Sequence, residues 1–244
     1  MKDLQTEAEK KPFAAAVKAL WIEMFEDKES YVDHYMSSSW KHNRVLLLLR
    51  GEEIVSMLHL NPYTCIVQGE RLDLHYIVGV CTKKAEQGKG YMGQLVTEAL
   101  RICKEDGEPF TYLMPAAEAI YRPYDFVSAG WCDKFVIEAE EADPSLPQAR
   151  WDAIVPELGQ AGSIQNVGNH TLQICPFDRW TAGQTKQLES FAAELPMDMH
   201  AAWTAAYFAE TDQQMKCYDG ELVAVWDQEK PIAIAAYLCE EDQS

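Results

Sequence analysis

The stretch from Leu74 to Gly107 constrains the fold more than any other part of the chain. It begins with Leu74 to Thr82, an apolar run rich in β-branched residues and of the length of a strand. Residues 83–93 follow as a glycine-rich turn, Lys-Lys-Ala-Glu-Gln-Gly-Lys-Gly-Tyr-Met-Gly. Beyond the turn, apolar residues recur at the i, i+3, i+4 spacing of an amphipathic helix, and Gly107 is suited to end that helix. The stretch therefore predicts a strand, a turn and a helix.

A glycine-rich turn that leads into a helix is a favourable place to bind phosphate. The first N–H groups of a helix have no partner within it, and the helix dipole puts partial positive charge there. Lys89 adds a full positive charge. A Walker A loop is excluded, because no GxxxxGK is followed by Ser or Thr. A nucleotide-binding fingerprint on Gly88, Gly90 and Gly93 lacks the acid that should end the next strand, so it stays an alternative only.

The segment Gln87 to Met92 resembles the pyrophosphate-binding loop of GNAT acetyltransferases, which holds the diphosphate of acetyl-CoA. Val80 to Thr82 resembles the end of the family's splayed fourth strand, whose backbone binds the pantetheine arm. Tyr121 to Phe126 resembles the family's Tyr-x-x-x-Gly-Phe segment, with Asp125 at the glycine position. Gly-Tyr-Met after the loop, together with residues 112–115 and 120–123, is most similar to the Eis-like branch.

This resemblance implies an α/β GNAT fold over residues 1–138, with a mixed, splayed central sheet flanked by helices. It implies acetyl-CoA as the cosubstrate, with no metal, and Tyr121 as the catalytic general acid that protonates the leaving thiolate; Tyr124 is the second choice. The residues that it assigns to the cofactor are Val80, Cys81, Thr82, Gln87, Gly88, Lys89, Gly90, Tyr91, Met92, Gly93, Ala116 and Ala117.

The acceptor side is expected at the start of the chain. Residues 1–11 are polar and expected to be frayed, and helices are predicted over 13–25 and 30–38. By the resemblance these helices lie over the acceptor, so Trp21, Phe25 and Tyr35 are predicted to contact substrate. The acidic residues Glu23, Glu26, Asp27 and Glu29 suit an amine pocket. The alternative is that the aromatic residues are ordinary core and the acids a solvated turn.

Further elements follow from apolar runs and turn residues. In the first domain these are a hairpin of strands 45–49 and 54–60 that ends at Asn61-Pro62, strands over 63–67, 109–114 and 131–138, and a helix over 115–121. Residues 139–168 are interpreted as a linker. Residues 169–244 are expected to form a strand, helices over 181–195 and 198–210, and a hairpin of strands 222–226 and 231–238. This order resembles the first half of a second GNAT-like unit, incomplete and without a cofactor site of its own.

The general base is not identified by the sequence. In Eis-like enzymes the terminal carboxylate of a third domain has this role, and this sequence has no third domain up to Ser244. His75, Glu52 and Glu53 are candidates. The predicted function is N-acetyl transfer from acetyl-CoA to a primary amine of an aminoglycoside, polyamine or Lys-containing peptide. The alternative is a catalytically weak acetyl-CoA-binding module with a regulatory or interaction role.

Composition excludes several other classes. The formal net charge of −18 disfavours nucleic acid as a partner and favours cationic ones, although acidity also serves solubility. No apolar run approaches the roughly 20 residues that span a membrane, and the start of the chain is unlike a signal peptide. Seven cysteines without a C-x-x-C pair favour a reduced, cytoplasmic setting over a disulfide or zinc framework. The oligomeric state, a homo-oligomer included, is left open.

Overall fold

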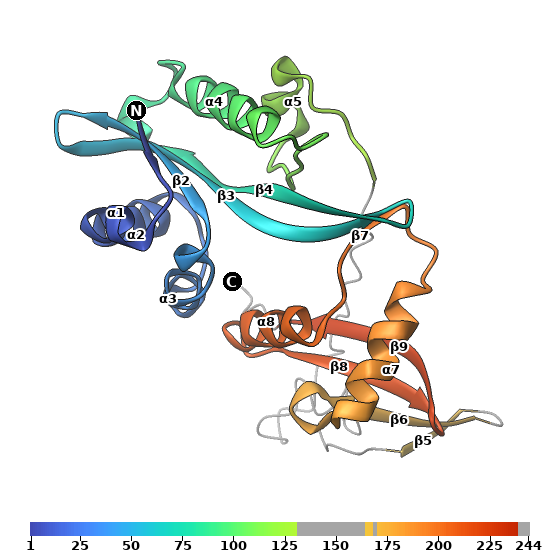
Figure 1. The fold of residues 1–244 in the computed structure, drawn as a ribbon. Helices are drawn as coiled ribbons and strands as arrows, with labels where there is room; N and C mark the ends of the chain where they lie inside the picture. The colour runs from blue at the N-terminus through green and yellow to red at the C-terminus, as the bar shows by residue number, and fades with distance from the viewer. Residues whose placement is uncertain (131–163, 168–169, 239–244) are drawn as a thin grey trace. The chain divides into compact units, whose positions relative to one another are not determined.

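Figure 1 presents a computed structural model of the chain, which describes residues 1–130, 164–167 and 170–238. The chain divides into two compact units. Unit 1 comprises Met1–Ala129 and Met197–Ala202, and unit 2 comprises Gly130–Pro196 and Trp203–Ser244. The predicted strand over 131–138 and most of the predicted linker lie outside the described residues, so the predicted domain limits stay predictions.

Unit 1 begins with ordered structure, and the expectation of a frayed start is wrong. Strand β1 (Lys2–Leu4) pairs with β2, and helix α1 (Glu7–Lys10) follows. A capping box begins α1: the Thr6 hydroxyl accepts from the Glu9 N–H, and the Glu9 carboxylate accepts from the Thr6 N–H. A 3₁₀ helix (Lys11–Phe13), α2 (Ala14–Met24), α3 (Glu29–Ser37) and a 3₁₀ helix (Ser39–Lys41) complete the segment.

The unit 1 sheet is antiparallel among β2 (Arg44–Arg50), β3 (Glu53–Val67), β4 (Glu70–Thr82) and β1, in the order β1-β2-β3-β4. The hairpin predicted between β2 and β3 is confirmed, but β3 does not end at Asn61-Pro62. It runs on through Pro62 to Val67. Proline is tolerated there because β3 has a neighbour on one side only: its pairing with β2 stops at Leu60, opposite Arg44, and its pairing with β7 (Met199–Ala201) starts at Cys65, opposite Ala201.

Helices cover both faces of this sheet, as Figure 1 shows. On one face, the core against β2 and β3 holds Leu20 and Trp21 of α2 and Val32 of α3. On the other face α4 (Tyr91–Glu105) buries Leu95 and Val96. The predicted end of α4 is confirmed: Gly107 has a φ of +81°, its N–H donates to Lys104 O, and the Glu108 N–H donates to Cys103 O. Two apolar layers therefore enclose the strand predicted to bind the cofactor, and the turn that follows this strand is exposed.

The chain after α4 is less regular than predicted. The strand expected over 109–114 is reduced to a single parallel bridge between Tyr76 and Tyr112, and most of its side chains are half-buried or exposed. Proline at both ends limits the N–H groups that a strand could offer. Helix α5 (Glu118–Tyr121) is shorter than predicted and continues as a 3₁₀ helix (Arg122–Tyr124).

Unit 2 holds strands β5 (Ile164–Val167), β6 (His170–Pro176), β8 (Glu221–Asp227) and β9 (Lys230–Tyr237), a 3₁₀ helix (Phe177–Arg179), and helices α7 (Ala182–Ala193) and α8 (Ala205–Lys216). The predicted helix over 198–210 is wrong in its first half, where residues 199–201 form β7 in the unit 1 sheet. Thr204 caps α8 through the Tyr207 N–H, which sets its later start.

The order of elements in unit 2 repeats that of unit 1. Each unit has a strand, two main helices and a hairpin, with sheet orders β1-β2-β3 and β6-β8-β9. All of these pairings are antiparallel. That unit 2 is an incomplete second copy of the same fold stays a prediction. None of the described helices has the length and apolar character that crossing a bilayer requires.

Candidate active site

Strand β4 carries a β-bulge at the predicted cofactor site. Cys81 lies opposite Met57 and Val78 lies opposite His59, so Gly79 and Val80 together face a single residue of β3. Gly79 has a φ of +62°, in the left-handed region that glycine favours. A bulge takes one residue out of the ladder, which leaves its backbone groups available to another partner. The backbone donors predicted near Val80 therefore lie where the ladder is interrupted.

The indole of Trp21 lies directly on this bulge. A Cβ atom on Gly79 would come within 2.9 Å of Trp21 Cζ3. Trp21 is held in that position by a 2.8 Å hydrogen bond from Nε1 to Asp27 Oδ2, and its ring packs 4.6 Å from that of Tyr35. The end of α2 and the backbone of β4 are thus in direct contact.

The turn between β4 and α4 has the backbone conformation that its glycines suggest. A 3₁₀ helix (Lys84–Glu86) leads to Gly88 and Gly90, both with φ of +75°. A Cβ on either glycine would meet nothing within 4 Å, so the space around the turn is open. Glycine is therefore favoured at these positions by the left-handed backbone conformation and not by a lack of space. Gly90 is the N-cap of α4 and brings no side chain to cap it. At the predicted anion site, the N–H groups of Tyr91, Met92 and Gly93 belong to the first turn of α4, where the N–H groups have no acceptor within the helix.

Two side chains of the turn bind neighbouring protein groups. Gln87 Nε2 donates to Thr82 O at 3.2 Å, which ties the turn to the end of β4. Lys89 Nζ forms a 2.7 Å ion pair with Glu86, whose other oxygen accepts from Arg50 at 2.8 Å. The bond from Lys89 lowers the pKa of the Glu86 carboxyl. Lys89 is therefore already paired, and an anion in the turn would share it with Glu86.

The first turn of α4 contacts the segment that carries the predicted acid. The hydroxyl of Tyr124 lies so close to Gly93 that a Cβ there would collide with it. Asp125 has a φ of +64°, in the left-handed region that glycine favours, and it stands at the glycine position of the Tyr-x-x-x-Gly-Phe segment that residues 121–126 resemble. The absence of a side chain at Gly93 and the left-handed backbone conformation of Asp125 allow the first turn of α4 to contact residues 121–126.

Tyr121 lies on α5, half-buried, with its ring 5.7 Å from that of Phe126. It packs against the same apolar cluster as Val80 and Met92. Burial raises the pKa of its phenol, and Tyr76 acts in the same direction. The phenol therefore stays protonated well into the alkaline range and can act as a proton donor.

The other predicted cofactor residues are in varied surroundings. Ser56 Oγ donates to Cys81 O at 2.8 Å and lies 2.8 Å from Thr82 Oγ1. Burial raises the pKa of the Cys81 thiol to about 12, so Cys81 is protonated and unsuited as a nucleophile. Ala116 and Ala117 are exposed beside the start of α5, where Ala117 is the N-cap.

The predicted acceptor residues are largely interior. Trp21 is 2% exposed and Tyr35 3% exposed, whereas Phe25 is half-buried. The Tyr35 hydroxyl lies 2.9 Å from His59 Nδ1, donates to Asn61 Oδ1 and accepts from Asn43 Nδ2. Trp21 and Tyr35 thus lie beneath the surface at the predicted acceptor side, and their direct contact with a substrate remains a prediction.

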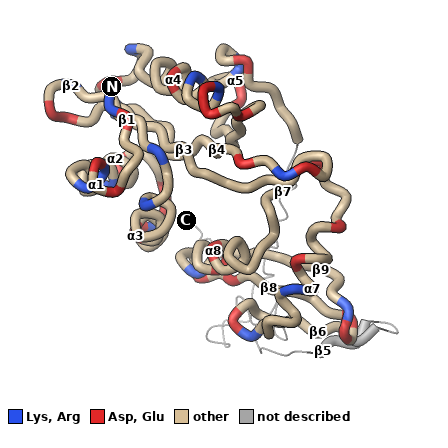
Figure 2. The backbone as a smooth tube through the Cα atoms, viewed as in Figure 1, with Lys and Arg blue, Asp and Glu red and all other residues tan. Residues whose placement is uncertain are grey.

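The candidate bases are engaged to different degrees. His75 Nδ1 lies 2.5 Å from Glu108 Oε1, and Glu53 pairs with Lys83. Glu52 is exposed in the β2–β3 turn, whose acids stand out in Figure 2. Burial and, to a smaller extent, the charge of Glu23 raise the pKa of Cys81, and Glu23 is an exposed residue of α2.

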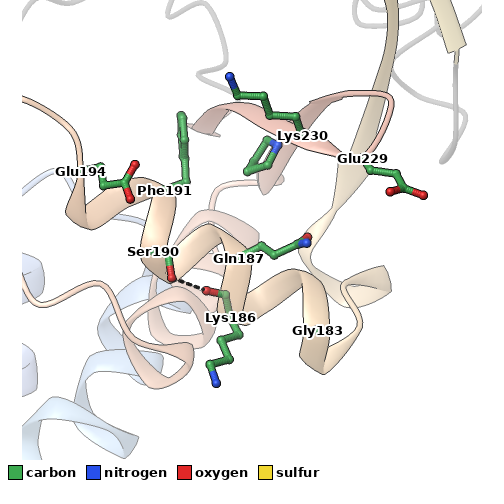
Figure 3. A pocket seen from close by; sticks show the side chains of 9 residues that line it. Gly183, Lys186, Gln187, Ser190, Phe191, Glu194, Glu229 and Lys230 are labelled. Carbon is green, nitrogen blue, oxygen red and sulfur yellow. Dashed lines mark hydrogen bonds between the residues drawn. The ribbon is translucent and has the colours of Figure 1, made fainter.

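A separate open pocket of about 560 Å³ lies in unit 2, between α7 and the β8–β9 turn. Figure 3 shows Phe191 and Glu194 of α7 on one side of it and Glu229 and Lys230 on the other. Ser190 Oγ donates to the Lys186 carbonyl and belongs to the helix wall. No predicted site residue lines this pocket.

Comparison with protein families decides the identity of unit 1. Residues 8–129, half of the chain, match the sequence model of the family described as an acetyltransferase (GNAT) domain. The chain belongs to the GNAT acetyltransferase family. The predicted family, the fold class and the assignment as an acyltransferase enzyme are thereby confirmed. The glycine turn, the bulge and Tyr121 all lie within the matched residues of this GNAT domain.

Solved structures include distant GNAT relatives. An aminoglycoside 6'-N-acetyltransferase from Acinetobacter haemolyticus is 18% identical, with a TM-score of 0.44 over 59% of this chain and 100% of that one. A GNAT acetyltransferase from Brucella melitensis in complex with acetyl-CoA is 15% identical, with a TM-score of 0.42 over 58% and 92%. A probable N-acyltransferase from Enterococcus faecalis V583 is 19% identical, with a TM-score of 0.43 over 51% of this chain.

The chain spans 31% of the length of the Enterococcus faecalis protein. A comparison with curated proteins finds no match. The assignment of this protein to the GNAT family therefore rests on the match of residues 8–129 to the family model.

Sequence reasoning missed three features of this GNAT site. The bulge at Gly79 was signalled only by a glycine inside a strand pattern. The hydrogen bond from Trp21 to Asp27 joins residues six apart across the end of α2 and follows no helical spacing. The pairing of His75 with Glu108 joins residues 33 apart and has no local signal.

Proposed function

We propose that this GNAT acetyltransferase moves the acetyl group of acetyl-CoA to a primary amine of a cationic acceptor, such as an aminoglycoside, a polyamine or a Lys-containing peptide. The amine lone pair attacks the thioester carbonyl carbon, and the C–S bond breaks. The leaving thiolate takes the proton of Tyr121, and the new amide nitrogen loses its proton to a base or to water.

Binding of the diphosphate is supported by the start of α4. Gly88 and Gly90 keep open space around the turn, and the N–H groups of residues 91–93 have no capping side chain from Gly90. When bound, acetyl-CoA supplies the activated acetyl group. The chain supplies the helix terminus, the positive charge of Lys89 shared with Glu86, and the backbone of the Gly79–Val80 bulge as a donor to the thioester oxygen.

The role of Tyr121 is supported by its surroundings. It packs against the same apolar cluster as Val80 of the bulge and Met92 of α4, which supports a site that draws on all three. Its raised pKa keeps the proton on the phenol over the pH range in which an amine acceptor gains its free base. The loss of rate from deprotonation of Tyr121 should therefore appear only above the ordinary tyrosine pKa of about 10.

A cationic acceptor is supported by the acids near the end of α2. Glu23 and Glu26 are exposed, and Glu23 acts electrostatically on both Cys81 and Lys83 at the end of β4. A carboxylate in that position attracts an ammonium group toward the bulge. We also assign the chain to the Eis-like branch, on the Gly-Tyr-Met sequence at residues 90–92.

The observation that carries this proposal is the shared cluster of Tyr121, the bulge and the start of α4. The test is Tyr121→Phe, with acetyl-CoA binding measured by calorimetry and thiol release measured across a panel of amines. We expect the rate to fall by roughly 10²–10⁴-fold with acetyl-CoA affinity unchanged. Tyr237→Phe removes a hydroxyl bonded to Glu221 in unit 2 and serves as the control with full rate. If the rate falls in Tyr124→Phe and not in Tyr121→Phe, the general acid is Tyr124.

A second candidate function is an acetyl-CoA-binding module without turnover. The observation in its favour is that Glu53, a candidate base, is paired with Lys83. Acetyl-CoA binding without thiol release in the native protein, for every amine tested, would favour this function over catalysis.

A further inference from the structure

We propose that His75, Cys103 and Glu108 form a zinc-binding site at the C-terminal end of α4. One ligand atom from each of these side chains lies within 4.8 Å of the other two. The three residues come from β4, from the last turn of α4 and from the residue that closes its terminal turn. This is the opposite end of α4 from the predicted acetyl-CoA site.

Hydrogen bonds hold the three side chains of the cluster together. The Glu108 N–H donates to Cys103 O at 2.9 Å, so these two ligands sit on one hydrogen-bonded turn. The His75 N–H donates to Glu108 Oε2 at 2.8 Å, which directs Oε1 toward the imidazole. Thr111 Oγ1 donates to His75 O at 2.6 Å and fixes β4 at this point. Such outer contacts orient the ligands of known zinc sites.

The donor set matches the preference of zinc. Sulfur, imidazole nitrogen and carboxylate oxygen bind zinc at about 2.0–2.3 Å, which places tetrahedral ligands about 3.5 Å apart. The ion therefore has to part Nδ1 and Oε1, now 2.5 Å apart, by about 1 Å. Cys103 is 3% exposed, whereas the His75 side chain is 22% exposed and offers the entry path and a fourth position for water.

The charge at this place also favours a cation. The C-terminal end of a helix carries partial negative charge, and α4 ends at Glu105, next to the cluster. Thiolate and carboxylate together neutralise a divalent ion. On binding, the S–H bond of Cys103 breaks and its proton goes to solvent. The proton that His75 Nδ1 donates to Glu108 moves through solvent to Nε2, so that the neutral imidazole binds through Nδ1. No electron is transferred in this step.

The test uses Co²⁺ as a spectroscopic substitute for Zn²⁺ in the full chain, reduced and stripped of metal. We expect a single equivalent of Co²⁺ to give a thiolate-to-cobalt charge-transfer band and tetrahedral d–d bands, both lost when Zn²⁺ displaces the cobalt. Cys103→Ala should abolish the charge-transfer band, and Glu108→Gln should weaken binding at least about tenfold. Cys175→Ala removes a buried cysteine outside the cluster and should leave the spectrum unchanged.

Two results would overturn the site. Native protein without the charge-transfer band would leave only the His75–Glu108 pair, and a band that survives in Cys103→Ala would come from other cysteines. Circular dichroism of each metal-free variant checks the fold. His75→Gln supplies an independent measure: zinc should raise the melting temperature of the native protein and not that of this variant. These readouts do not depend on acetyl transfer, so they stand apart from the proposed function.

Discussion

Replacing Gly79 with alanine should destabilise unit 1 by about 2–5 kcal/mol. The backbone at Gly79 has a φ of +62°, and an L-residue in this left-handed region costs about 1–2 kcal/mol. The new Cβ would also lie 2.9 Å from Trp21 Cζ3, closer than van der Waals contact. Overpacking of this kind costs a further 1–3 kcal/mol or so, because Trp21 is 2% exposed and tied to Asp27.

Gly51→Ala is the matched control. Gly51 has a φ of +64° and nothing within 4 Å of an added Cβ, so it tests the backbone cost alone. The difference between the two variants, about 1–3 kcal/mol, then measures the collision with Trp21. Adding Trp21→Phe should recover part of the loss in Gly79→Ala, since the smaller ring has no atom at that place.

Stability has to be measured within unit 1, because a chain of two units need not unfold in one step. Hydrogen exchange in increasing urea, followed by mass spectrometry on peptides of β3 and β4, reports the free energy of opening of that sheet. Equal destabilisation by Gly79→Ala and Gly51→Ala would refute the argument from the Trp21 contact.

Two further predictions concern the polar groups buried in unit 1. Lys10→Met should lower the free energy of unfolding by about 2–4 kcal/mol, because Lys10 Nζ donates to Trp40 O and Asn43 O and its loss leaves these buried carbonyls without that donor. Lys11→Met, at an exposed position, is the control. Equal rates of hydrogen exchange in the two variants would contradict this prediction. Burial lowers the pKa of His59 to about 3, so between pH 6.5 and 3 the unfolded chain binds the proton and the folded chain does not. The free energy of unfolding should then fall by about 1.4 kcal/mol as the pH drops from 5.5 to 4.5. His59→Gln should lack this contribution to the pH dependence. If the pH dependence is the same in the native protein and in His59→Gln, His59 titrates alike in the folded and unfolded states.

Local sequence signals predicted the parts of the site that lie close together in the chain. The apolar run to Thr82, the glycines at 88 and 90 and the helix to Gly107 are each specified by near neighbours, and the structure places all three as expected. The same holds for α7, whose capping box at Thr181 lies within four residues. Propensity and capping act over a few residues, which is why they could be predicted.

Pairings between distant segments could not be predicted in this way. Strand β7 adds to β3 across more than 130 residues, with Cys65 opposite Ala201, and its three residues show no strand pattern of their own. β3 can continue past Pro62 because neither β2 nor β7 pairs with β3 at that residue. A strand tolerates proline where it pairs with a neighbouring strand on one side only. The sequence alone does not show on which side a strand has a neighbour.

The sequence by itself determined the family, the strand–turn–helix that is predicted to bind acetyl-CoA, and the tyrosine proposed as its acid, because each is encoded by adjacent residues. Only the tertiary structure decided that Trp21 and Tyr35 lie beneath the surface, and that His75, Cys103 and Glu108 meet. The physical reason is that burial and side-chain pairing depend on which distant segments pack together, and packing against β4 brings these residues into contact.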